Sequence, residues 1–196
     1  MNKLWITLIV TVGILLSMSW YVWDTYNNLV QLDESVKQSW SQVENVYQRR
    51  LDLIPNLVES VKGYAEHENE TFKAVTEARS RAGGVLAKDI INDRDKFNGF
   101  VNTQGALSSA LGRLIAVAEN YPNLKANENF LSLQSQLEGT ENRISVERSR
   151  YNIVAQIFNT KIKQIPANLV AKIFKFNEKV YFKADDEAKT APKVMF

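Results

Sequence analysis

The feature that most constrains this chain is an uncharged segment near its start. The twenty residues from Leu4 to Trp23, LWITLIVTVGILLSMSWYVW, contain no Asp, Glu, Lys or Arg. As an α-helix this segment is about 30 Å long, which matches the hydrocarbon core of a bilayer. The sequence therefore predicts a membrane-spanning helix, and we assign residues 1–24 to a transmembrane anchor that contacts the lipid bilayer.

Aromatic side chains lie at both ends of this segment. Trp5 is near its start, and Trp20, Tyr21 and Trp23 are near its end. Indole and phenol rings favour the headgroup region, so we expect these four residues to mark the membrane interface. A cleaved signal peptide is the alternative, but its apolar region is shorter and ends at a small-x-small cleavage site. Here bulky side chains continue to Trp23, which favours an uncleaved signal-anchor.

The charges that flank the anchor indicate its orientation. Lys3 precedes the segment, whereas Asp24, Asp33 and Glu34 all come before Lys37 on the other side. The side of the membrane richer in Lys and Arg close to the span is usually the cytoplasm. We therefore expect a single-pass protein with a cytoplasmic N-terminus and an extracytoplasmic domain.

Composition excludes several classes of protein. About 170 residues remain after the anchor, enough for one domain. The chain has 24 Lys and Arg against 22 Asp and Glu, so no strong positive field is available to attract nucleic acid. It has no cysteine, which excludes disulfides and thiolate metal sites. We expect neither a nucleic-acid partner nor a cofactor.

Apolar residues after the anchor recur with helical spacing. They are spaced by three, four and four residues in turn, and are Leu29, Leu32, Val36, Trp40, Val43, Tyr47, Leu51, Ile54 and Val58. This eleven-residue period is close to that of a relaxed helix and predicts a nearly straight rod. Trp40 and Tyr47 are expected in its core. The pattern continues through Tyr64 and Ala82 to the Gly83–Gly84 pair, a strong helix breaker.

Two places interrupt the helical pattern. Pro55 lacks a backbone donor and crowds the preceding turn, so it predicts a kink or a restart near residues 53–56, with Asp52 as a cap. Residues 88–100 are densely charged and their periodicity fades, which predicts a loop or mobile link. A further helix is expected from Leu107 to Tyr121, where Pro122 follows.

The longest regular pattern starts near Asn127. A seven-residue repeat comprises Phe130, Leu137, Ile144, Tyr151, Phe158 and Ile165, and a companion series comprises Leu133, Glu141, Arg148, Ala155 and Ile162. Such heptads predict a coiled-coil-like helix packed antiparallel along the rod. Pro166 closes this helix, and residues 167–174 predict a short one. An extended tail follows, with expected anchors at Tyr181, Phe182, Val194 and Phe196.

The predicted fold class is therefore all-α. An N-terminal transmembrane helix continues into an antiparallel bundle of three to four long helices over residues 25–175, which includes the short C-terminal helix. Residues 176–196 form the extended C-terminal tail.

Two blocks of this sequence resemble the LemA family of bacterial membrane proteins. The first is the run from Tyr26 to Glu68, with RRLDLIPNLVESVKGYA at its centre, followed by TEARSRA at residues 76–82. The second is YNIVAQIFNTKIKQIPANLVAKIFKFNEKVYF, with APKVMF at the end. The resemblance implies a single N-terminal anchor and an antiparallel helical bundle, but no known reaction, and we expect the anchor in the bacterial inner membrane. The resemblance also implies links to envelope homeostasis and to the shaping of internal membranes.

The residues that could carry catalysis are few. His67 is the only histidine, and Glu66, Glu68 and Glu70 surround it. A di-iron bundle site needs Glu-x-x-His on two helices, so one histidine does not suffice, and a solvated acidic face is the better interpretation. No nucleophile elbow, phosphate loop or dinucleotide fingerprint is present. We expect a protein that is not an enzyme.

Seven residues near the predicted kink and in the heptad seam are the structural or interaction candidates: Arg49, Arg50, Asp52, Pro55, Asn56, Glu141 and Arg148. In an antiparallel bundle these charges could meet near its middle, where an unpaired charge is costly. We expect an internal ion-pair layer that sets helix register, with Arg50 nearer the core than Arg49. A ligand or partner site at the kink is the alternative.

Three functions follow from these patterns. The first is an anchored, non-enzymatic scaffold that forms a homo-oligomer and organises or remodels the membrane or cell envelope. The second is a membrane-tethered binding module or adaptor for an envelope protein such as a protease or sensor. The third is a metal-dependent enzyme, which the single histidine disfavours. This hypothesis predicts that His67→Ala loses both bound metal and function.

The orientation of the anchor is directly testable. Because the chain has no cysteine, Ser135→Cys creates a single labelling site in the bundle. We expect a membrane-impermeant maleimide to label it in cells whose outer membrane is permeabilised and whose inner membrane is intact. Protection of the thiol until the inner membrane is lysed would contradict the predicted topology.

Overall fold

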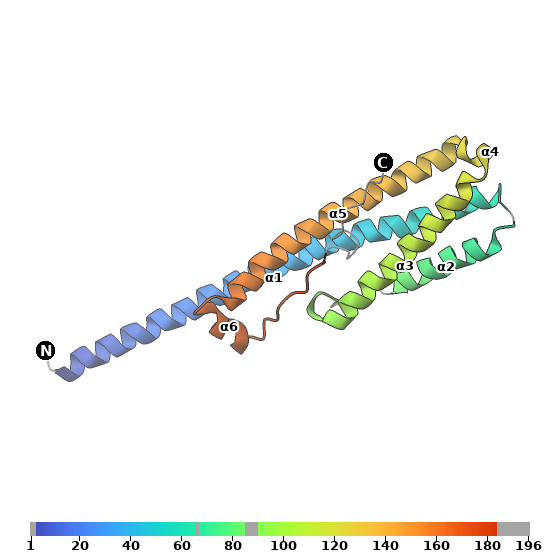
Figure 1. Cartoon of the computed structure of the whole chain (residues 1–196). Helices are drawn as coiled ribbons and strands as arrows, with labels where there is room; N and C mark the ends of the chain where they lie inside the picture. Colours follow the sequence, from blue (N-terminus) through green and yellow to red (C-terminus); the bar gives the residue numbers. More distant parts are fainter. Residues whose placement is uncertain (1–2, 66, 85–89, 184–196) are drawn as a thin grey trace, which may run out of the picture.

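The computed structural model describes residues 3–65, 67–84 and 90–183 (Figure 1). These residues are mainly helical and include no strand, which confirms the all-α prediction. The order of elements is α1 (Lys3–Lys62), α2 (Asn69–Gly84), the 3-10 turn η1 (Ile90–Asn92), α3 (Arg94–Glu119), α4 (Pro122–Lys125), α5 (Glu128–Lys163) and α6 (Ala167–Ile173).

The apolar segment and the rod belong to one helix. α1 has 60 residues, and its first part projects beyond the other helices (Figure 1). From Leu4 to Trp23 every side chain except that of Val22 is exposed. By length and composition this helix could cross a membrane. The predicted continuity between the apolar segment and the rod is confirmed.

The restart predicted at Pro55 is wrong, because α1 runs through this residue without interruption. Asp52 caps no new helix, and its carboxylate accepts a hydrogen bond from Gln48 on the same helix at 2.8 Å. Leu51 and Ile54 beside the proline are buried. Packing of this apolar face therefore holds the helix together where local preference would break it.

The rod is also shorter than predicted. α1 ends at Lys62 and α2 turns back antiparallel to it, so that Gly83 lies beside Leu51. Tyr64, expected in the core, is exposed. Gly63 follows Lys62 directly, and glycine is a poor helix former, which suits a helix end at this place. α2 ends at Gly84, as the glycine pair predicted.

Most of the segment predicted as a loop at residues 88–100 is structured. Residues 85–89 lie outside the described ranges, but Ile90–Asn92 form η1 and α3 begins at Arg94. The side chain of Asp93 accepts hydrogen bonds from the backbone N–H groups of Asp95 and Lys96, which makes it the N-cap. The dense charges therefore occupy the start of a helix, whereas Phe97 and Phe100 are buried.

α5 runs antiparallel along α1, and α2 and α3 pack beside the half of α1 farther from the apolar segment (Figure 1). The core consists of two large apolar clusters. One, far from the apolar segment, lies among α1, α2, α3 and α5 and includes Leu57 and Leu107. The other, nearer the segment, is rich in aromatic residues and includes Trp40 and Tyr151. Trp40 and Tyr47 are buried, as predicted.

The last described residues follow the bundle. α5 ends at Lys163, before Pro166, and α6 packs against α1. Residues 176–183, here called the strap, have no regular secondary structure and contact the aromatic cluster. Phe182 is buried there, and Tyr181 is partly buried. The other two expected anchors, Val194 and Phe196, lie outside the described residues.

Candidate functional site

A buried arginine lies at the centre of the helix interface. The side chain of Arg50 is only 2% exposed, and its Nη1 donates to Glu141 Oε1 at 2.8 Å and to Ser108 Oγ at 3.0 Å. Its Nη2 donates to the side-chain oxygen of Gln104. Three helices, α1, α3 and α5, thus meet at one guanidinium. Arg50 is the inward member of the Arg49–Arg50 pair, and Arg49 is exposed.

This polar layer separates the two apolar clusters of the core. Tyr47 belongs to the aromatic cluster and Leu51 to the other one, so Arg50 stands at the boundary between them. The arginine also lies over the Tyr47 ring, 5.1 Å from its centroid. A shift of α5 by one heptad would put Gln134 or Arg148 in the place of Glu141 and leave a buried charge without its partner, which is strongly unfavourable. The layer thus gives α1 and α5 a preferred register.

Pro55 has a partner on another helix. A proline nitrogen cannot donate to the carbonyl four residues earlier, so the Leu51 oxygen loses its usual helical bond. Arg79 of α2 supplies the replacement, because its Nε donates to Leu51 O at 2.9 Å. The proline therefore creates a docking point for α2 within an unbroken helix.

The structure does not bring the seven candidate residues together. Arg50 and Glu141 meet, whereas the side chains of Arg49, Asp52 and Asn56 are exposed. Pro55 is also exposed. Arg148 lines the cavity beside this layer, but its guanidinium lies over the ring of Phe182, 4.7 Å from the centroid, and donates to Lys183 O at 3.2 Å. The expected pairing of Arg148 within the ion-pair layer is wrong, because the strap occupies the space next to it.

Two asparagines of α5 hold the strap by paired hydrogen bonds. Asn159 donates to Lys179 O and accepts from Lys179 N, both at 2.8 Å. Seven residues earlier, Asn152 makes the same pair with the backbone of Phe182 at 2.9 Å. Each amide replaces the backbone partner that an extended segment would find in a sheet. The buried Tyr151 hydroxyl donates to Val180 O at 2.9 Å, and burial raises its pKa.

A second ion pair, again with a buried cation, joins the strap to α1. Lys179 Nζ lies 2.6 Å from Asp33 Oδ1 and donates to Asn92 Oδ1 at 2.7 Å. Lys37 approaches the other carboxylate oxygen of Asp33 at 2.9 Å. Burial acts to raise the pKa of Asp33, but the hydrogen bonds and charges of the two lysines outweigh it and lower the pKa. Asp33 therefore stays ionised in the folded protein at neutral pH.

Sequence reasoning missed most of the residues that hold the strap. Asn152 and Asn159 are one heptad apart, which places them on one face of α5. Two amide side chains at heptad spacing beside an apolar seam could have indicated, from sequence alone, that α5 binds a polar segment there. Asp33 and Lys179 carried no comparable signal, because 146 residues separate them in sequence and only the fold brings them together.

The acidic region around His67 shows no convergence of ligands. His67 is exposed, and the described residues contain no group of three His, Cys, Asp or Glu side chains placed to hold a metal ion. Glu66, which precedes His67, lies outside the described residues.

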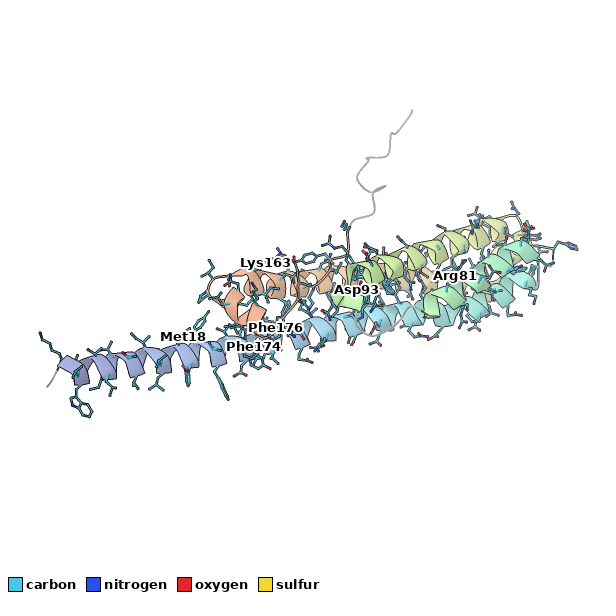
Figure 2. The ribbon with its side chains drawn as sticks, turned by 90° about the horizontal axis from the view of Figure 1, so that it is seen from below. Met18, Arg81, Asp93, Lys163, Phe174 and Phe176 are labelled. Carbon is cyan, nitrogen blue, oxygen red and sulfur yellow. The ribbon has the colours of Figure 1, made fainter. Side chains whose placement is uncertain are left out.

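The expected interface aromatics are all on the free part of α1. Trp5, Trp20 and Trp23 are strongly exposed, and Tyr21 is the least exposed of the four. Nearby, Val22 and Tyr26 contact the end of α6, where Phe174 lies. Figure 2 shows Met18 on the free part of α1 and Phe174 where that part meets the bundle.

These features define a class of protein: an elongated antiparallel helical bundle, crossed by a buried ion-paired layer and carried on one exposed apolar helix. The sequence profile of the LemA family matches residues 39–196. The chain therefore belongs to the LemA family, as its two sequence blocks predicted.

Named relatives share this sequence at low identity. The chain is 28% identical over 174 residues to magnetosome protein MamQ 1 of Paramagnetospirillum magneticum, a match covering 80% of this chain and 64% of the relative. It is 26% identical to magnetosome protein MamQ of Magnetospirillum gryphiswaldense with the same coverage. Protein LemA of Metamycoplasma hominis is 27% identical over 160 residues, 82% of this chain and 69% of that protein. The chain thus spans less than two thirds of the MamQ proteins.

The Arg50 layer can be tested by removing the charge of its partner. Glu141→Gln leaves the buried guanidinium without a carboxylate, and we expect a loss of about 2–3 kcal/mol in the free energy of unfolding. Glu138→Gln is the matched control, because Glu138 is exposed on the same helix. Urea unfolding of both variants in detergent measures the difference. Equal effects of the two substitutions would contradict a stabilising ion pair.

The strap ion pair predicts a pH dependence. Because the pKa of Asp33 is lower in the folded protein, its contribution to stability is present above about pH 4 and is lost as the pH falls through the folded pKa. Asp33→Asn should therefore destabilise the protein at pH 7 by a few kcal/mol, and the difference from wild type should shrink below pH 4. Thermal unfolding from pH 3 to pH 8 measures this, with the exposed Asp52→Asn as control. A pH-independent difference would show that the carboxylate charge is irrelevant.

Proposed function

We propose that this chain is a membrane-anchored, non-enzymatic scaffold that self-associates and organises or remodels the bacterial cell membrane or envelope. The N-terminus lies in the cytoplasm, residues 4–23 span the inner membrane, and the bundle is extracytoplasmic. The single observation that carries the proposal is the continuity of an exposed apolar segment with the bundle in one 60-residue helix. A stiff connection of this kind holds every copy at the same height and angle, which favours repeated side-by-side contacts.

The outer face of α5 supports a lateral contact. Val146, Ile153 and Ile157 are each about half exposed, and spacings of seven and four residues place them on one side of the helix. We name these three residues the α5 stripe. Beside it, a shallow groove of about 400 Å³ between α1 and α5 is lined in part by Ile153, Ser39 and Arg150. An apolar stripe next to a groove is suited to packing against a second copy.

The relatives are compatible with a membrane role of this kind. The MamQ proteins are named for the magnetosome. Family membership and an elongated helical bundle suit a structural role, and the ion-paired layer around Arg50 serves to align helices.

One observation favours the second candidate, a membrane-tethered adaptor for an envelope protein. An open cavity of about 570 Å³ lies beside Arg50, Gln104 and Arg148. Its lining also includes the polar side chains of Ser108 and Glu141, and such a lining suits a polar or charged side chain of a partner. Crosslinking that yields a stoichiometric foreign protein without self-crosslinks would favour this adaptor role.

Self-association is tested by disrupting the α5 stripe. We expect the detergent-solubilised full chain to form oligomers in mass photometry and Ile153→Glu to shift them toward monomers, because a carboxylate would be buried in the contact. Leu131→Glu is the matched control. Leu131 is similarly exposed on the same helix, but lies about 33 Å farther along it. A wild-type chain that stays monomeric at high concentration would contradict the scaffold.

A further inference from the structure

α6 exposes apolar side chains on the face turned away from the bundle. Ala167, Val170 and Ala171 are buried. On the other side Leu169 is 62% and Ile173 70% exposed, and Ile165, just before the helix, is 85% exposed. Large apolar side chains that are exposed next to one another usually mark a surface that protein or lipid covers. Here the inner side is already packed, so the outer side lacks its apolar environment.

The place of α6 in the fold indicates what that environment is. Phe174, directly after the helix, lies 4.6 Å from the ring of Tyr26. Tyr26 follows Trp23, the last residue of the uncharged segment, by less than one helical turn. Phe174 also lines an apolar notch of about 450 Å³ together with Leu15 and Met18 of α1. Phe174, the residue directly after α6, therefore lies beside the end of the segment that we assign to the membrane (Figure 2).

The charges on α6 suit the same environment. Lys172 lies within the helix and Lys175 just after it, and both are exposed. No acidic residue occurs from residue 164 to residue 177. Apolar side chains combined with lysines are typical of a helix that lies at a membrane surface, where the ammonium groups approach anionic headgroups.

We propose that residues 165–174 form a lipid-binding foot in the headgroup layer of the bilayer that α1 spans. Ile165, Leu169 and Ile173 insert into the boundary between headgroups and acyl chains, and an acyl chain fills the notch beside Phe174. The inference rests on the proposed function, because it requires residues 4–23 to be embedded. With the foot bound, the bundle meets the membrane at two places, which restricts its tilt and rotation about the anchor.

A depth measurement on the full chain tests the foot. The variants Leu169→Cys, Leu131→Cys and Leu15→Cys each carry one thiol, because the chain has no cysteine of its own. Each is labelled with an environment-sensitive fluorophore and reconstituted into vesicles of phosphatidylcholine and phosphatidylglycerol. Lipids with a spin label at the top of the acyl chain then quench a probe at that depth, and lipids labelled near the end of the acyl chain quench a probe near the bilayer centre, where an embedded Leu15 lies. Circular dichroism checks that each variant is folded.

We expect several-fold stronger quenching at Leu169 than at Leu131, which is exposed at the far end of α5, together with quenching at Leu15. Quenching at Leu15 but not at Leu169 would overturn the foot and leave the anchor in place. A blue-shifted but unquenched Leu169 probe would show that a second copy covers α6, which also overturns it. Absence of quenching at Leu15 would remove the embedded anchor, and the proposed function and the foot would fall together.

Discussion

The antiparallel pairing of α1 with α5 is the interaction on which the rest of this structure depends. α1 alone is a long helix with one apolar stripe, and α5 is the partner that covers most of it. The Arg50–Glu141 pair gives this interface a preferred register. That register places Trp40 against Tyr151 and brings α6 beside the end of the uncharged segment. Both proposed surfaces, the α5 stripe and the foot, follow from this alignment.

Polar side chains determine details that apolar packing leaves open. Two helices packed by apolar stripes can slide along each other with little loss, because one apolar contact replaces another. A buried charge or amide instead needs its own partner, and sliding removes that partner. Arg79 satisfies the carbonyl that Pro55 frees, and Asn152 and Asn159 satisfy the backbone of the strap. Each of these contacts joins segments that are distant in sequence, and each supplies a donor or acceptor that the local backbone lacks.

The two ends of the bundle differ in a way that suits a membrane protein. At the far end, α2 and α3 complete the core around α1 and α5. At the near end, α6 exposes apolar side chains, and Phe174 directly after it lies beside Trp23 and Tyr26 of α1. An exposed apolar surface of this size is unfavourable in water and is stable where lipid or protein covers it. The bundle therefore has one end with a completed core and one end with exposed apolar side chains.

The sequence by itself determined the apolar segment, the helical stripe from Leu29, the heptads of α5 and the family, because these are periodic or contiguous patterns. It also identified Arg50 and Glu141, since charges in an apolar seam must be paired. Tertiary structure decided that α1 continues through Pro55, that α3 begins at Arg94 and that Arg148 serves the strap. In these places contacts between distant segments outweighed local preference, and a single stretch of sequence does not contain the free energy of such contacts.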